Sequence, residues 1–160
     1  MAYKGKFKPK NPKKYMGDPT DIVYRSLKER AVMVFFDESP YVTKWGSETV
    51  VIPYKWQVDN KMHRYFVDFV ADISTISGNV RKLLIEFKPH CQTKPPSKPK
   101  RETAKRKNRF IKESVTYIKN INKWEAAEKW AQKNGREFVV ITEKDTKQML
   151  YFNQLIKEIQ

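Results

Sequence analysis

Apolar residues recur along the chain with two different periods, and the change of period separates helices from strands. From residue 18 to residue 39 they recur every three or four positions, as on the faces of a helix. Asp18-Pro19 has the form of a helix start, with an N-cap residue before proline at the first helical position. We therefore predict a helix over residues 18–39. One of its apolar stripes is interrupted by Glu29.

Three runs rich in β-branched and aromatic residues follow, and they predict strands. The polar breaks between them are short enough for hairpins, which indicates an antiparallel meander. Pro53 in the first run favours an edge strand or a bulge. The runs are ETVVIPYKWQV from residue 48, HRYFVDFVADI from 63 and VRKLLIEFKPH from 80.

The second half of the chain predicts two further helices around one short strand. Residues 109–134 have helical character, with a break expected at 120–122 and a stop at Gly135. The run 136–142 suits an interior strand, and 145–159 suits a final helix. A helix between the third and fourth strands favours a parallel crossover. The prediction is an α/β fold whose mixed sheet is flanked by helices.

Charge changes this picture, because the formal net charge of +15 is concentrated in two segments. Residues 1–14 hold six lysines and no acid, and residues 94–109 hold eight Lys or Arg and one Glu. The remainder is nearly balanced, with 19 basic and 17 acidic residues. We expect a basic N-terminal arm over 1–17 and a single domain over 18–160.

The domain carries a Pro- and Lys-rich segment at 93–109, predicted as a loop that turns helical near Glu102. Clustered cations suit a polyanion backbone and demand no particular base sequence, which favours DNA as partner. A role in solubility alone is the plainer alternative. The candidate DNA-binding residues are Lys98, Lys100, Arg101, Lys105, Arg106, Lys107 and Arg109.

Cysteine and histidine are too scarce for a disulfide or a zinc centre. The chain has Cys91 as its single cysteine and only His63 and His90 as histidines, so we expect an intracellular protein without zinc. No signal sequence or long apolar run is evident, and we expect no membrane partner.

Charged residues interrupt two of the predicted strands at matching places. Alternation along the third run puts Leu84, Glu86 and Lys88 on one face. In the preceding run, Asp68 also interrupts an apolar face, which it shares with its neighbours at 66 and 70. If the two runs pair as a hairpin, Asp68 and Glu86 converge.

Two converging carboxylates repel each other unless a cation lies between them. A hard ion such as Mg²⁺ takes oxygen ligands, which Asp68, Glu86 and the backbone carbonyl of Phe87 can supply. Lys88 can then orient or help deprotonate a water and stabilise charge on a phosphate. Glu29 can complete the outer coordination or hold a second ion. The pattern favours phosphodiester hydrolysis, and the alternative is a solvated Glu86–Lys88 ion pair with Asp68 capping a sheet edge.

A Glu in the first helix, an Asp in the second strand and Glu-x-Lys in the third resemble the PD-(D/E)xK nuclease superfamily, whose fold is restriction-endonuclease-like. Val67-Asp68 replaces its usual Pro-Asp. Longer strings resemble the head completion nucleases of T-even-type tailed phages. These strings are GDPTDIVYRS, WGSETVVIPY, HRYFVDF and IEFKPHCQTKPPSKP.

The resemblance implies an αβββαβ core and an active site of Glu29, Asp68, Glu86 and Lys88. It also implies Mg²⁺ as cofactor, with Mn²⁺ as a substitute. The partners would be DNA and the portal or neck proteins of a phage head, met in the host cytoplasm during assembly or in the virion neck. Two alternatives stay open: a non-catalytic neck or portal plug that holds the packaged DNA end, and a transposase-like or junction-resolving nuclease unconnected with virions.

Overall fold

A computed structural model describes residues 3–145 and 147–159, and its centre is a four-stranded mixed sheet in the order β3-β6-β7-β8. Strands β7 and β8 are parallel, and the other neighbours are antiparallel. The sheet strands are β3 (Val42–Ser47), β6 (Phe69–Ser74), β7 (Val80–Phe87) and β8 (Glu137–Ile141), and the helices are α1 (Leu27–Glu38), α2 (Ala104–Lys133) and α3 (Leu150–Ile156). No helix in these described ranges is both long and apolar enough to span a membrane.

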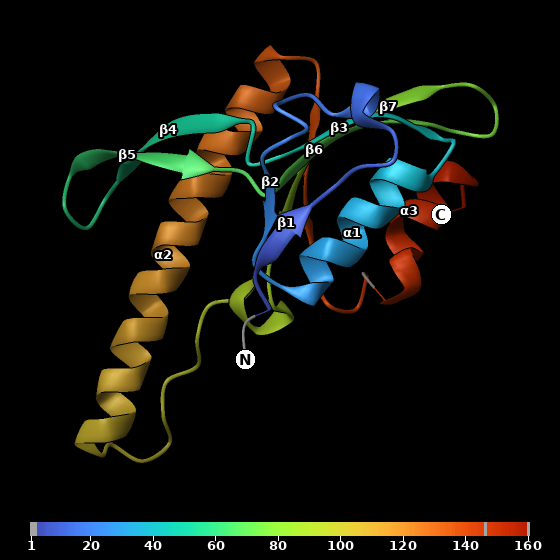
Figure 1. The fold of residues 1–160 in the computed structure, drawn as a ribbon. Coiled ribbons are helices and arrows are strands. Elements are labelled where there is room, and N and C mark those ends of the chain that lie inside the picture. Colours follow the sequence, from blue (N-terminus) through green and yellow to red (C-terminus); the bar gives the residue numbers. More distant parts are fainter. Residues whose placement is uncertain (1–2, 146, 160) are drawn as a thin grey trace.

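Helices cover both faces of the sheet, as predicted (Figure 1). Helices α1 and α3 lie side by side on one face, where Phe35 stacks on Phe152 with ring centroids 5.7 Å apart. Helix α2 covers the other face. Alternation along β7 serves both layers, because Leu83 and Ile85 join the α1/α3 core while Leu84 joins the α2 core. The sheet is therefore buried on both sides.

The expected αβββαβ core is present as α1, β3, β6, β7, α2 and β8, but its first strand is not the predicted one. The run from residue 48 contributes β4 (Val51–Trp56), which pairs only with β5 (Lys61–Phe66) in a separate hairpin. Its place in the sheet is taken by β3. The sequence did not predict this strand because Lys44 and Gly46 interrupt the alternation of apolar and polar residues. The run from residue 63 also divides at Val67 and Asp68, where the hairpin ends and β6 begins.

The predicted helix start at Asp18 is wrong. Residues Ile22–Tyr24 form strand β2, which pairs with β1 (Gly5–Phe7) from the basic N-terminal segment. Helix α1 begins only at Leu27, where Ser26 is the N-cap and its hydroxyl accepts a hydrogen bond from the Glu29 N–H. The β-branched residues before Ser26 favour a strand, and the cap residue fixes the later start.

Helix α2 runs without the break that was predicted at residues 120–122. Asn120 and Asn122 are buried, and the Asn122 carboxamide oxygen accepts a hydrogen bond from the Gln57 N–H of the β4–β5 hairpin. Asn122 therefore serves a tertiary contact, and neither asparagine interrupts the helix. The predicted stop is confirmed, since Gly135 has a φ of +65° directly after the helix. The expected final helix is shorter than predicted and comprises a 3₁₀ turn (Lys147–Met149) followed by α3.

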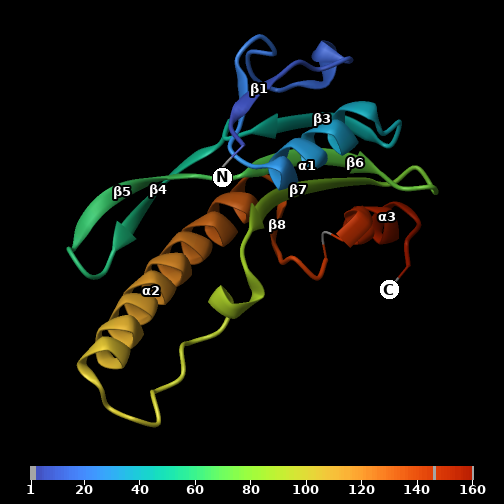
Figure 2. The same cartoon turned by 60° about the horizontal axis from the view of Figure 1, so that its bottom comes forward.

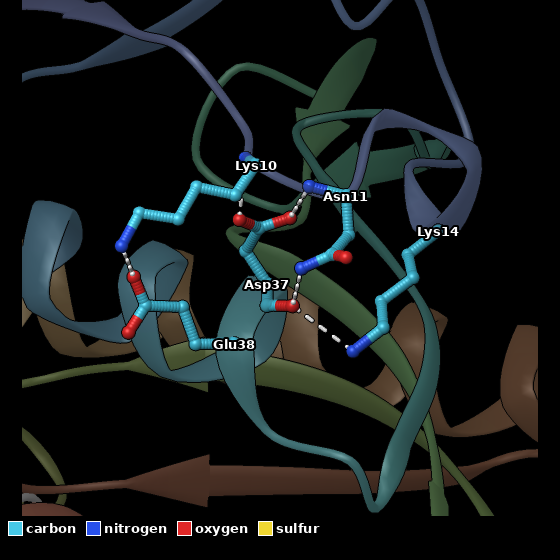
Figure 3. A network of polar contacts seen from close by, with 5 residues as sticks. All are labelled: Lys10, Asn11, Lys14, Asp37 and Glu38. Carbon is cyan, nitrogen blue, oxygen red and sulfur yellow. Dashed lines mark hydrogen bonds and ion pairs between the residues drawn. The ribbon is translucent and has the colours of Figure 1, made fainter.

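The basic N-terminal segment is held on α1 by one buried carboxylate (Figure 3). Asp37 is only 1% exposed, and its two oxygens accept hydrogen bonds from the backbone N–H groups of Lys10 and Asn11, at 2.7 and 3.0 Å. The Asn11 amide and the Lys14 ammonium donate to the Asp37 carbonyl at the carboxyl end of α1. The segment is thereby fixed between α1 and the edge strand β3, where Tyr15 bridges to Trp45.

We expect Asp37→Ala to destabilise the fold by about 2–3 kcal/mol, because two backbone N–H groups lose a charged acceptor. Urea unfolding followed by circular dichroism measures this loss. Glu38→Ala is the matched control, since it removes only the exposed ion pair with Lys10 and should change stability little. Equal losses in both variants would contradict the anchoring role of Asp37.

Candidate active site

The register between β6 and β7 brings Asp68 next to Glu86. Phe69 pairs with Ile85, so the residue before β6 lies beside the penultimate residue of β7. The Asp68 Oδ2 atom accepts a hydrogen bond of 2.8 Å from the Phe87 N–H. The expected convergence of the two carboxylates is therefore present. The shared face with residues 66 and 70 is not, because the strand breaks at Asp68, leaving Phe66 exposed and Val70 buried.

Glu86 is a buried carboxylate with a partner on each oxygen. Its side chain is 3% exposed, its Oε1 lies 3.1 Å from the Lys88 ammonium, and its Oε2 accepts a hydrogen bond of 2.6 Å from the Tyr65 hydroxyl. The predicted placement of Glu86 and Lys88 on one side of the strand is confirmed. Their pairing is not that of a solvated surface pair, because even the Lys88 side chain is only 23% exposed.

Negative charge at this site is incompletely compensated. Burial and the neighbouring Glu86 raise the pKa of Asp68 to about 7, although the Phe87 N–H and Lys88 act in the opposite direction. Burial and Glu86 also raise the pKa of the Tyr65 hydroxyl, which stays protonated and donates. A bound cation would relieve the repulsion between Asp68 and Glu86.

The donor set fits a hard divalent cation. Asp68, Glu86 and the carbonyl of Phe87 would offer oxygen ligands, which such ions prefer. No group of three or more His, Cys, Asp or Glu side chains suited to a metal occurs within residues 3–145 and 147–159. His63 is engaged elsewhere, with its Nε2 2.6 Å from Asp59 in the β4–β5 hairpin.

Glu29 has a structural task at the start of α1. It occupies the third helical position, and its carboxylate accepts a hydrogen bond of 2.7 Å from the Arg25 N–H while its own N–H donates to Ser26. Glu29 also adds to the rise in the Asp68 pKa, so its charge is felt at the site. The structure brings Glu29 to the same cleft as Asp68 but does not gather it into one metal-binding group.

A cleft of about 670 Å³ opens beside these residues on the α1 side of the sheet. Asp68, Phe87 and Lys88 line its sheet side, and Glu29 lines its α1 side. The loop after β8 closes the remaining wall with Thr142 and Glu143. A ligand in this cleft would meet Asp68 and Lys88 directly.

Sequence reasoning missed two residues at this site, Tyr65 and Lys123. Tyr65 was detectable in principle, because a buried tyrosine needs a partner for its hydroxyl and the partner here is Glu86. Lys123 of α2 gave no signal in the sequence. Its ammonium lies 5.1 Å from the Tyr65 ring centroid, and burial together with Lys88 lowers its pKa.

The candidate DNA-binding residues are all exposed, at the end of the molecule where α2 begins (Figure 2). Lys98, Lys100 and Arg101 lie in the segment before the helix, and the other four lie on its first two turns. In both ribbon views this end of α2 extends well beyond the sheet.

Comparison with known proteins identifies the family. The family model described as "TnsA-like endonuclease N terminal" matches residues 39–143, a range that includes Asp68, Glu86 and Lys88 and leaves out Glu29. The head completion nuclease of Enterobacteria phage T4 is 44% identical over 143 residues, which cover 89% of this chain and 93% of the relative. No solved structure matched the chain significantly. With its restriction-endonuclease-like fold, the chain belongs to the TnsA-like endonuclease N-terminal family and is a homologue of a phage head completion nuclease.

Proposed function

We propose that this protein is a Mg²⁺-dependent endonuclease that hydrolyses phosphodiester bonds in DNA during phage head completion. The observation that carries the proposal is the buried Glu86 carboxylate, which pairs with Lys88 and lies beside Asp68, where Asp68 and Lys88 line a cleft. Charges are costly to bury, and these three are arranged as in the Asp and Glu-x-Lys positions of PD-(D/E)xK nucleases. Membership of an endonuclease family supports the reaction.

Each residue has a distinct task in the proposed reaction. Asp68, Glu86 and the Phe87 carbonyl would hold the divalent ion, with Mn²⁺ as a substitute for Mg²⁺. When bound, the ion polarises the phosphodiester and makes a nearby water easier to deprotonate. Lys88 orients the attacking water and stabilises the negative charge that develops on the phosphate. Glu29 acts from the α1 side of the cleft, through its charge and not as a shared ligand.

The proposed setting is the assembly of a phage particle in the host cytoplasm. The relative named a head completion nuclease is covered over 93% of its length, which supports the same role here. The protein would act on the filled head before the tail is joined, where it would meet both packaged DNA and the portal or neck proteins. A non-catalytic plug would need the basic surface but not the buried Glu86–Lys88 pair.

Lys88→Ala and Asp68→Ala should each lower the rate of plasmid nicking in Mg²⁺ at least about a hundredfold, because each removes a group that acts on the reacting phosphate or its metal. Agarose gel electrophoresis of a supercoiled plasmid measures the rate, and EDTA should abolish it in the wild type. Lys82→Ala is the matched control, since Lys82 is an exposed lysine of the same strand. Equal nicking by the wild type and all three variants, or no nicking by any of them, would contradict the catalytic assignment.

Tyr65→Phe should weaken Mg²⁺ binding about tenfold or more, because the hydroxyl that orients Glu86 is lost while the ring remains. Isothermal titration calorimetry with MgCl₂ measures the affinity without any need for turnover. Tyr54→Phe is the control, since Tyr54 lies on the paired strand and packs edge-on against Tyr65, with ring centroids 6.4 Å apart. Unchanged affinity in Tyr65→Phe would show that the hydroxyl does not position Glu86.

Heads completed with the Lys88→Ala protein should fail to join tails if cleavage is the function. Electron microscopy of assembly mixtures gives the fraction of filled heads that carry tails. Restoration by the wild-type protein, added to the same heads, shows that they were competent. Normal joining with the variant would support the plug instead.

A further inference from the structure

The face of α2 that contacts the sheet turns from apolar to basic as the helix leaves the sheet. Residues three or four apart share one face of a helix. Near its carboxyl end this face carries Ala127 and Ala131, both fully buried in the α2 core. Continued toward the amino end at the same spacing, the face carries Lys123, Lys119, Thr116, Lys112, Arg109 and Lys105.

Two of these lysines are held by aromatic rings of the β4–β5 hairpin. The Lys119 ammonium lies 4.8 Å from the Trp56 ring centroid, and that of Lys123 lies 5.1 Å from the Tyr65 ring centroid. Such contacts orient an ammonium without neutralising it. Because the Tyr65 hydroxyl donates to Glu86, the basic face reaches the candidate active site at Lys123.

The positive charge along this face is largely uncompensated. No ion pair within the described part of the chain involves Lys119 or Lys123. Glu125 and Glu128 lie on the far side of the helix by its 3.6-residue period. Glu113 pairs with Arg109, but both side chains are substantially exposed, at 47% and 80%, where such pairs are weak.

We propose that the basic stripe of α2, formed by Lys105, Arg109, Lys112, Lys119 and Lys123, binds the phosphates of one DNA strand and leads that strand toward Lys88 at the end of β7. The reaction at the end of the stripe rests on the proposed function, whereas the binding does not. From its first to its last cation the stripe rises about 27 Å, which corresponds to about eight phosphates of one strand of B-DNA. The substrate is therefore DNA that extends at least about eight nucleotides to one side of the scissile bond.

The test is the salt dependence of DNA affinity, measured by fluorescence anisotropy in EDTA with a duplex of about 30 base pairs. Lys119→Gln and Lys123→Gln should each weaken binding about fivefold and reduce the slope of log K against log salt by about 0.9. Lys129→Gln is the control, because Lys129 is exposed on the same helix but off the stripe, and it should leave both quantities unchanged. Lys123→Arg should restore the slope, which separates charge from packing.

A wild-type salt slope in both stripe variants, or an equal reduction of the slope in Lys129→Gln, would contradict the proposed DNA-binding role of the stripe. Thermal unfolding of each variant identifies any loss of fold. The two proposals fail separately. A wild-type protein that binds through the stripe but never nicks DNA overturns the nuclease alone, and one that nicks while the stripe variants bind as wild type overturns the stripe alone.

Discussion

The rest of the structure depends on the burial of the Glu86 carboxylate at the end of β7. An ionised carboxylate taken out of water loses several kcal/mol of hydration unless other groups replace it. Here Lys88 and Tyr65 occupy its two oxygens, and each comes from a different part of the sheet region. Tyr65 belongs to the β4–β5 hairpin, which pairs with no other strand among the described residues. Glu86 therefore links the hairpin to the central sheet through the hydrogen bond from Tyr65, in addition to the packing between them.

Helix α2 supplies the support that makes this link rigid. It packs on Leu84 of the sheet and on the hairpin, and Asn122 holds the turn of the hairpin through the Gln57 N–H. On the other face, α1 and α3 bury the alternate residues of β7. Because both faces of β7 are fixed, Glu86 and Lys88 have little freedom to move apart. Preorganised charge of this kind is what hydrolysis of a phosphodiester requires.

The sequence predicts most where a pattern has a single physical cause. Alternation along β7 correctly predicted that Glu86 and Lys88 lie on the same side of the strand. The prediction succeeded because both faces of β7 are packed, so each position has a definite environment. Sequence reasoning missed β3, whose exposed Lys44 and close-packed Gly46 carry no period. It also missed the break at Asp68, because β-branched and aromatic residues on both sides of Asp68 predict one strand. In the sequence, Asp18 is a plausible helix cap as well as Ser26. In the structure the Asp18 carboxylate accepts a hydrogen bond from the Thr20 hydroxyl and does not cap α1. Contacts such as Lys123 with Tyr65 arise only from the tertiary arrangement.

The continuity of α2 through its buried asparagines has a consequence for where a bound strand can be cut. Helix α2 is packed in the core at its carboxyl end and extends free of the sheet at its amino end (Figure 2). Because the rise per residue of a helix is constant, the distance between any two of its residues is fixed. Its 30 residues pass from the free end to the sheet without a hinge. DNA bound along the free end would then reach Lys88 at a fixed distance, so the length of the helix would set the spacing between the bound phosphates and the cleavage site.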